Sequence, residues 1–481
     1  MSDTDQPASL VETHSAVVFF YGDRVLKVKK AVDLGFLDFS SLAARRIACE
    51  REVTLNRRLS PDVYLGVSQV LGPDGEVCDY LVTMLRMPDD RRLGACITRG
   101  EPVRPDLSDI ARQMAGLHAT ESTPELLDVA DRDSVRSHWS DGFAQLAPHQ
   151  GGLIDPVIEM RIESLALRYL DGRKALFDER IAEGSVRDGH GDLQCQDIFL
   201  LPDGPRILDC LEFDDNLRWG DVLLDVGFLA MDLERFGHVE LAQQFLDDYR
   251  AISGRQWPTS LAHHYLAYRA HVRAKVGVLR AAQQHLPAAP SEVEVLQQLC
   301  LDHLEAGAVR MIIVGGLPGT GKSTVAAALG KAVGAVVLRT DEIRRRIPDP
   351  DRYSNHAIDV TYTEMLSEAE ALLLRGEQVI LDATWSDGAH RDMARITADR
   401  SGADIIEINC VAPSDVCRAR ILRRMTEGSD VSEATPEVAD DMARRFARWP
   451  QAIEIETDRT ITESLRSALA ACGWSGSPLA A

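Results

Sequence analysis

Residues 316–323 read GLPGTGKS and match the phosphate-binding pattern G-x-x-x-x-G-K-[ST] at every fixed position. The flanks have the order that this motif requires. Val309–Val314 is a short apolar run typical of a strand, and the residues after Ser323 are Ala-rich and typical of a helix. Glycines let the loop turn so that successive N–H groups and the helix N-terminus meet phosphate oxygens. The stretch therefore predicts a nucleoside triphosphate site.

Each residue type in this loop has an expected role. Lys322 is predicted to reach the β- and γ-phosphates of ATP or another nucleoside triphosphate, and Ser323 is predicted to ligate Mg²⁺. The residues expected to surround the phosphates are Gly316, Gly319, Thr320, Gly321, Lys322, Ser323 and Thr324. The alternative is an ordinary glycine-rich turn before a buried helix, and the two matching flanks disfavour it.

Strands and helices alternate after the loop, which predicts a doubly wound parallel sheet of the α/β class with ligands at the carboxyl ends of its strands. The further strands are expected at Ala335–Arg339, Gln378–Leu381 and Asp404–Val411. Asp341 and Asp382 lie at two such ends, and Asp341 is expected one strand over from the phosphate loop. An acid in this position can also be only a helix cap.

The motifs of this half together resemble P-loop kinases that include polynucleotide kinase, zeta toxins and chloramphenicol phosphotransferase, within an AAA-type ATP-binding family. The resemblance covers residues 309–460 and is carried by GLPGTGKST, the D-x-x-R of Asp341–Arg344, VILDAT at Val379–Thr384 and RARILRR at Arg418–Arg424. It implies that Asp341 is the general base for the attacking hydroxyl and that Arg344 grips an anionic part of the acceptor. It also implies that Asp382 holds the Mg²⁺ shell and that Arg420 and Arg424 lie on a lid over the triphosphate. The alternative for the arginines is a solvated helix face.

A lysine and a glutamate stand out in the first part of the chain. Val17–Phe20 and Val25–Val28 read as a β-hairpin that places Lys27 on its second strand. Ala43–Leu59 has a helical apolar stripe and carries Glu52. Protein kinases hold a lysine against ATP phosphates with this arrangement, although solvated surface residues are the alternative.

Residues 188–213 read DGHGDLQCQDIFLLPDGPRILDCLEF, which has the order of a kinase catalytic loop. Asp192 is followed five residues later by Asp197. The apolar runs Ile198–Leu201 and Ile207–Leu211, joined by the turn residues Pro202-Asp203-Gly204-Pro205, then predict a hairpin that ends in Asp209. Acidic turn residues without chemistry are the alternative.

HGDLQCQD and ILDCLEF resemble the catalytic and metal-binding segments of aminoglycoside phosphotransferase-like kinases, over about residues 11–280. The resemblance implies a protein-kinase-like α+β fold with Asp192 as catalytic base and Asp209 as the principal Mg²⁺ ligand. It makes Lys27 and Glu52 the pair that orients the phosphates. It also implies that two further acids, Asp221 and Asp225, brace the catalytic loop.

Two departures from that family matter. Asp197, the second candidate metal ligand, stands where the family has Asn, and its extra charge predicts either different metal loading or weakened catalysis. No convincing glycine-rich loop precedes Lys27, although Thr13-His14-Ser15 occupies its place.

Composition limits the classes of partner. The formal net charge of −22 argues against broad contacts with nucleic acid or an anionic membrane. The nine cysteines are scattered without a C-x-x-C pair, which favours reduced thiols. No apolar run is long enough for a membrane span and the N-terminus is acidic, so the expected location is cytoplasmic.

The sequence thus predicts two modules, residues 1–306 and 307–481, that both transfer the γ-phosphoryl group of ATP to a hydroxyl of a small-molecule acceptor. Mg²⁺ is the expected metal, and the oligomeric state is left open. The first rival is a nucleotide-binding regulatory switch, which Asp197 favours. The others are a toxin-like kinase of nucleotide sugars and a kinase of nucleic-acid ends, for which Arg344-Arg345-Arg346 would bind a phosphorylated terminus.

Overall fold

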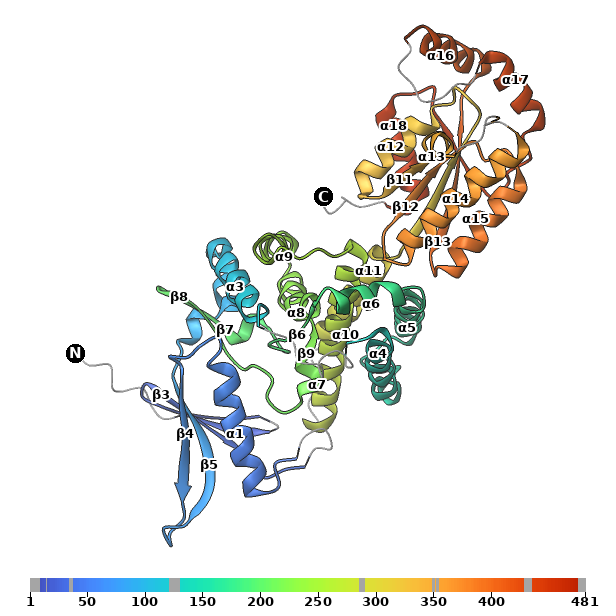
Figure 1. Cartoon of the computed structure of the whole chain (residues 1–481). Helices are drawn as coiled ribbons and strands as arrows, with labels where there is room; N and C mark the ends of the chain where they lie inside the picture. The colour runs from blue at the N-terminus through green and yellow to red at the C-terminus, as the bar shows by residue number, and fades with distance from the viewer. Residues whose placement is uncertain are drawn as a thin grey trace. The chain divides into compact units, whose positions relative to one another are not determined.

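The computed structural model describes residues 9–13, 15–33, 38–120, 130–284, 290–347, 351, 354–427 and 435–474. The chain forms two compact units, each with its own main sheet (Figure 1). The first unit comprises Met1–Glu163, Phe177–Trp257 and Ala262–His303. The second unit comprises Ser164–Leu176, Pro258–Leu261 and Leu304–Ala481. The second unit therefore includes two short segments from the earlier part of the chain.

The first unit begins with an antiparallel sheet in the order β1-β2-β3-β5-β4. Its strands are β1 Ser9–Glu12, β2 Ala16–Tyr21, β3 Arg24–Lys29, β4 Tyr64–Leu71 and β5 Val77–Leu85. The hairpin predicted from Val17–Phe20 and Val25–Val28 is confirmed as β2 and β3, and the predicted helix is confirmed as α1, Leu42–Asn56. Val53 of α1 packs with Val25 and Val82 of the sheet. This packing turns the Glu52 side of α1 toward β3.

Helices make up most of the remaining first part of the chain. They are α2 Leu93–Thr98, α3 Arg104–Leu117, α4 Arg132–Leu146, α5 Pro156–Asp171, α6 Lys174–Ala182, α7 Asp215–Arg218, α8 Val222–Arg235, α9 Val239–Ser253, α10 Thr259–Gln284 and α11 Pro290–Ala306. Two small antiparallel ribbons lie among them in the chain, β6 Val186–Asp188 with β9 Trp219–Asp221 and β7 Ile198–Leu201 with β8 Gly204–Ile207.

The second strand of the predicted catalytic hairpin was placed too late in the sequence. It is β8, which begins at Gly204 and ends at Ile207, so the turn is only Pro202-Asp203. Asp209 lies beyond the strand in a left-handed conformation with φ 63°, which few non-glycine residues adopt. The apolar run 207–211 misled the prediction because its later residues are buried without pairing in a sheet.

The second unit is a five-stranded sheet in the order β11-β12-β10-β13-β14, and every neighbouring pair is parallel. The predicted doubly wound parallel sheet is therefore confirmed. Its strands are β10 Arg310–Gly315, β11 Val336–Arg339, β12 Val379–Asp382, β13 Asp404–Val411 and β14 Ile453–Glu456. Its helices are α12 Lys322–Val333, α13 Thr340–Arg346, α14 Asn355–Leu373, α15 Gly388–Arg400, α16 Ser414–Glu427, α17 Pro436–Arg445 and α18 Ile461–Ala471.

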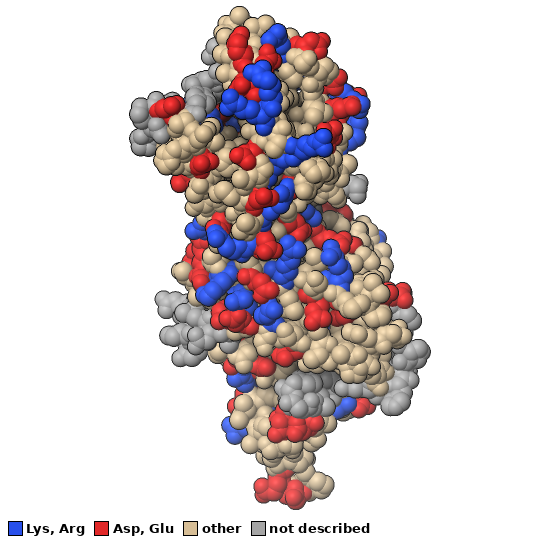
Figure 2. Space-filling view, turned by 90° about the vertical axis from the view of Figure 1, so that its right-hand side faces the viewer, with Lys and Arg blue, Asp and Glu red and all other residues tan. Residues whose placement is uncertain are grey.

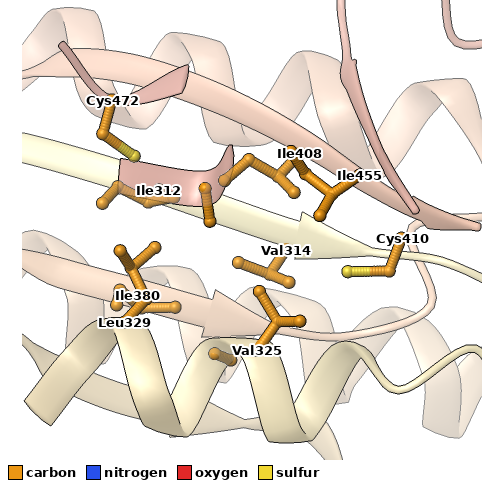
Figure 3. Packing of buried hydrophobic residues seen from close by; sticks show 11 residues of the cluster. Ile312, Val314, Val325, Leu329, Ile380, Ile408, Cys410, Ile455 and Cys472 are labelled. Atoms are coloured by element: carbon orange, nitrogen blue, oxygen red, sulfur yellow. The ribbon is translucent and has the colours of Figure 1, made fainter. Parts of the chain in front are cut away.

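The core of this second unit fixes the helix that follows the phosphate loop. Val325 and Leu329 on the inner face of α12 point toward Val314 of β10 and Ile380 of β12 (Figure 3). All four side chains are almost wholly buried. Because the central strands of a parallel sheet are covered on both faces, they read as continuous apolar runs. The loop between β10 and α12 is thereby held at both ends by packed elements.

Two further features concern the surface charge and the apolar character of the helices. Basic and acidic side chains are interspersed over parts of the face shown in Figure 2. Among the described helices, none combines the length and the apolar character that crossing a bilayer requires.

Candidate nucleotide sites

Lys27 in the first unit lies between two carboxylates. Its Nζ is 3.0 Å from Oε1 of Glu52 on α1 and 2.9 Å from Oδ1 of Asp209. Burial opposes the charge of Lys27, but Asp209 and Glu52 outweigh this effect and raise its pKa. The lysine and glutamate predicted to form a pair are thus brought together, and Asp209 joins them. An ammonium held in this way can face phosphate oxygens while it stays charged.

Lys29 extends this cluster and was not among the residues predicted from the sequence. Its Nζ is 2.6 Å from Oε2 of Glu52 and also contacts Oε1 of Glu212. Glu52 is wholly buried and Lys29 nearly so. Burial raises the pKa of Glu52, but Lys27 and Lys29 overcome it and leave the pKa below its ordinary value. The signal that would have revealed Lys29 is its position two residues after Lys27, which places both on one face of β3.

The left-handed conformation of Asp209 is held by hydrogen bonds from its own N–H and from the N–H of the next residue. The N–H of Asp209 donates to the Tyr64 hydroxyl at 3.1 Å, and the N–H of Cys210 donates to Oδ1 of Asn56 at 2.8 Å. Lys27 lowers the pKa of the Asp209 carboxyl to about 2. This carboxyl is therefore ionised at neutral pH and projects toward Lys27.

The catalytic-loop segment is braced from α8. Oδ2 of Asp225 accepts the N–H of His190 at 2.7 Å, and its Oδ1 accepts the N–H of Gly191 at 2.8 Å. His118 donates to the same carboxylate over 3.0 Å. The bracing role expected of Asp225 is confirmed. The same expectation for Asp221 is wrong, because Asp221 caps α8 and binds Arg180 through both carboxylate oxygens instead.

Asp192 follows this braced segment. Nε2 of Gln194 donates to Oδ1 of Asp192 at 2.6 Å. Burial raises the pKa of Asp192 to about 6, against the opposing charge of Arg273. A carboxylate with a pKa near neutrality can accept a proton from an attacking hydroxyl.

The carboxyls of Asp197 and Asp209 are the candidate metal ligands in this unit. Burial, then Asp209 and Asp192, raise the pKa of Asp197 well above its ordinary value. A hard divalent cation neutralises the negative charge of carboxylates that lie this close together. The residues present therefore fit Mg²⁺. Among the described residues, no three His, Cys, Asp or Glu side chains form a preassembled metal cluster. His14, in the segment expected to replace the glycine-rich loop, lies outside the described residues.

The phosphate loop of the second unit requires its glycines. Gly316 has φ 136° and Gly319 has φ 86°, which are unfavourable for other residues. A Cβ on Gly316 would lie 2.5 Å from the carbonyl oxygen of Cys410, and one on Gly319 would lie 2.5 Å from that of Cys417. The loop ends at Gly321, the residue before α12. Backbone N–H groups at the start of α12 are therefore available to an anion.

Asp382 ends β12 beside this loop. It is 4% exposed, and its Oδ1 is buried without a hydrogen-bond partner among the described residues. Burial raises the pKa of Asp382, and the charge of Lys322 and the hydroxyl of Ser323 oppose the shift. An orphaned carboxylate oxygen near a serine hydroxyl fits a Mg²⁺ site, because both are hard oxygen ligands.

Asp341 and Arg344 are bound to each other. Nη1 of Arg344 donates to Oδ1 of Asp341 at 2.8 Å within the single short helix α13. The expected position of Asp341 one strand over from the loop is wrong, because β12 lies between β10 and β11 in the sheet. Sequence order alone misled here, since crossovers allow successive strands to be separated. Asp341 still follows the carboxyl end of β11, and Arg339 at that end pairs with Asp382.

The two predicted lid arginines lie on α16. Nη1 of Arg420 donates to the carbonyl of Gly319 at 3.3 Å, and its Nη2 donates to the carbonyl of Thr457 at 2.6 Å. Arg420 therefore supports the backbone of the phosphate loop. Arg424 lies one helical turn further along, and Arg418 links α16 to α17 through Asp440 at 2.8 Å.

Comparison with known proteins shows similarity to one domain family and to relatives of nearly equal length. Residues 311–449 match the family described as AAA domain, whose P-loop binds nucleotide. The chain is 40% identical over 468 residues to the uncharacterized proteins Rv2004c of Mycobacterium tuberculosis and Mb2027c of Mycobacterium bovis. The alignment covers 94% of this chain and 93% of each relative.

Two solved structures show likeness to separate parts of the chain. A choline/ethanolamine kinase family protein from Mesorhizobium loti is 14% identical, with 63% of this chain and 90% of that chain covered at a TM-score of 0.40. The APS kinase of Mycobacterium tuberculosis in complex with AMPPNP and APS is 22% identical, with 34% and 98% covered at a TM-score of 0.29. Both TM-scores are low.

Proposed function

Since this chain belongs to the family of the mycobacterial proteins Rv2004c and Mb2027c, and its second unit carries an AAA domain, we propose that it is an ATP- and Mg²⁺-dependent phosphotransferase with two nucleotide sites. Each site transfers the γ-phosphoryl group to a hydroxyl of a small-molecule acceptor. The observation that carries the proposal is the position of Lys27, within 3.0 Å of Glu52 and 2.9 Å of Asp209. Such a charged lysine beside a metal-ligand carboxylate serves phosphoryl transfer.

In the first unit, Asp192 takes the proton of the acceptor hydroxyl as that oxygen attacks the γ-phosphorus. Lys27 orients the phosphates, and Glu52 keeps it in place. Asp209 and Asp197 would hold Mg²⁺. The bound metal would neutralise charge on the phosphate oxygens, which assists an in-line displacement.

In the second unit, Lys322 and the N–H groups that begin α12 bind the phosphates, while Ser323 and Asp382 would hold Mg²⁺. Asp341 is the base for the second acceptor. It must exchange its contact with Arg344 for the acceptor hydroxyl, which frees Arg344 to bind an anionic group. Arg424, on the predicted lid, supplies positive charge to the triphosphate. Arg420 supports the loop through Gly319.

A second candidate function, a nucleotide-dependent switch, is favoured by Asp197 alone. Its carboxyl lies near Asp209 and Asp192 and has a raised pKa. A third acid at this position adds negative charge where the phosphates bind, and it can reduce turnover while nucleotide still binds. In that case only the second unit would transfer phosphate.

The test uses the full chain with Mg-ATP and a panel of sugars, aminoglycosides, nucleosides and 5′-hydroxyl oligonucleotides. We expect a labelled small-molecule product with wild type. Lys322→Ala and Asp341→Asn should remove transfer by the second unit, and Asp192→Asn should remove transfer by the first. Arg112→Gln, on an exposed pair with Asp109, is the matched control and should retain both activities. ATP binding without any labelled acceptor would favour the switch.

A further inference from the structure

Helix α10 carries a pair of arginines spaced one helical turn apart, Arg269 and Arg273. Arg269 is 7% exposed and fixed in place. Its Nε donates to the carbonyl of Leu224 on α8 at 3.1 Å, and its guanidinium lies 4.7 Å from the ring centre of Phe228. Leu224 directly precedes Asp225, which holds the catalytic loop. Helix α10 is thus anchored beside the loop that carries Asp192.

Arg273 differs from Arg269 because its Nε lacks a hydrogen-bond partner. Its Nε is buried without a hydrogen-bond acceptor, and it forms no ion pair within the described part of the chain. Its charge is close enough to Asp192 to oppose the rise of that pKa. A buried donor without an acceptor is unfavourable, so an arginine left in this state is poised for an anionic partner.

Arg269 joins Arg273 in opposing the rise of the Asp192 pKa. Burial lowers the pKa of Lys275 on α10 and of His138 on α4, and in both cases Asp141 opposes the shift. Arg269 and Lys275 also contribute to the lowered pKa of His138, and Asp214 counteracts them. Arg269 and Arg273 thus act on Asp192, whereas Lys275, Asp141 and Asp214 act on the neighbouring His138. Two permanently charged guanidinium groups therefore act on the Asp192 carboxylate.

We propose that the acceptor of the first unit is an anionic hydroxyl compound, bearing a phosphate or carboxylate group that Arg273 binds. The inference rests on the proposed function and names the substrate class of that site. A guanidinium forms charge-assisted hydrogen bonds with either group, often in pairs. The same charge repels a polycationic acceptor, so aminoglycosides are excluded as substrates of this unit.

The chemical step requires only ATP and the acceptor. The acceptor hydroxyl oxygen forms a bond to the γ-phosphorus, and the bond from that phosphorus to the β-phosphate oxygen breaks. ADP leaves with those electrons, and the hydroxyl proton passes to Asp192. Binding of the distant anionic group at Arg273 positions the hydroxyl for this attack.

The first test is binding of inorganic phosphate to the full chain, measured by titration calorimetry with both nucleotide sites saturated by AMP-PNP and Mg²⁺. We expect a phosphate site in wild type whose affinity falls about tenfold or more in Arg273→Gln. Arg273→Lys should restore part of the affinity because it keeps the charge. Arg280→Gln, an exposed position on the same helix, should bind as wild type does. Equal binding by Arg273→Gln, or no phosphate site in wild type, overturns the proposal.

The second test compares acceptors with one carbon skeleton in a Lys322→Ala background: glucose 6-phosphate, gluconate, glucose and glucosamine. Transfer should favour glucose 6-phosphate if phosphate is the recognised group and gluconate if carboxylate is. Faster transfer to glucose or glucosamine than to either anion contradicts the proposal. Phosphate binding that depends on Arg273 without transfer to any compound would leave this inference standing while the proposed function fails.

Discussion

Nζ of Lys29 lies 2.6 Å from Oε2 of Glu52, the carboxylate whose other oxygen is 3.0 Å from Lys27. One buried glutamate therefore holds two lysines of the same strand, and Glu212 completes the cluster. This relationship makes Lys29 a positioning residue for Lys27.

The first prediction concerns the loss of this second lysine. Lys29→Gln leaves Glu212 and one oxygen of Glu52 buried without a cation, which should lower the free energy of unfolding by about 3–5 kcal/mol. Urea unfolding of the full chain measures the change. Arg24→Gln is the control, because Arg24 lies on the same strand with an exposed partner. If the two variants unfold alike, Lys29 does not stabilise the cluster.

The second prediction is the pH dependence of the first unit. With its pKa raised by burial to about 6, Asp192 is protonated below that pH and cannot accept a proton. In Lys322→Ala protein, kcat/KM should therefore rise with pH through about 6 and level off above it. A rate that stays constant from pH 5 to 8 would show that Asp192 is not the base.

A stability effect of the same residue provides an independent check. The folded pKa lies above the ordinary value of 3.8, so this group favours folding at low pH and that contribution is lost as pH rises through about 6. Above that range the buried carboxylate costs up to about 3 kcal/mol. Asp192→Asn should then be more stable than wild type at pH 7 and similar to it near pH 4. Urea unfolding at both pH values measures this difference.

The third prediction tests a close backbone contact within the second unit. A Cβ on Gly172 would lie 2.3 Å from the carbonyl oxygen of Ser401, and the buried Arg173 donates to the same carbonyl at 2.7 Å. Gly172→Ala should therefore destabilise this unit by about 1–3 kcal/mol, because the backbone must shift. Thermal unfolding compares it with Gly388→Ala, where an added Cβ meets nothing within 4 Å. Equal midpoints would refute the contact.

The fourth prediction separates metal binding from phosphate binding at Asp382. Asp382→Asn removes the charge that the orphaned Oδ1 offers to Mg²⁺, so the affinity for Mg-ATP should fall about tenfold or more. With EDTA present, wild type and variant should bind ATP alike, since Lys322 and the loop remain. The assay is fluorescence titration with a labelled ATP analogue. A loss that persists in EDTA would indicate damage to the loop instead.

Local patterns predicted much of both units. The glycine loop, its strand and its helix were identifiable because the motif requires particular residues in sequence, and Asp404–Val411 forms a strand with the predicted bounds. Lys27, Glu52 and Asp209 were also predicted as members of one site. The positions of their side chains were not predictable in detail, because these depend on packing between distant segments.

Features that depend on tertiary arrangement escaped the sequence. Nothing local in Lys29 or Glu212 shows that they meet across 183 residues of chain. The insertion of β12 between β10 and β11 depends on how crossovers run, and the left-handed Asp209 depends on acceptors supplied by Tyr64 and Asn56. Each of these is decided by long-range contacts.

The fifth prediction concerns acid stability, which depends on a buried histidine pair. Nδ1 of His263 lies 2.8 Å from Nδ1 of His303, whose Nε2 lies 2.9 Å from Glu234. Burial, then His303, lower the pKa of His263 to about 3. Because the folded pKa lies below the ordinary 6.5, stability is complete above pH 6.5 and falls as pH drops toward 3, by about 2 kcal/mol at pH 5. In His263→Gln, the unfolding free energy should differ less between pH 7 and pH 5 than in wild type, by about that amount. In His238→Gln, whose side chain is 37% exposed, the difference should stay as in wild type. An unchanged difference in His263→Gln would assign the acid sensitivity to other groups.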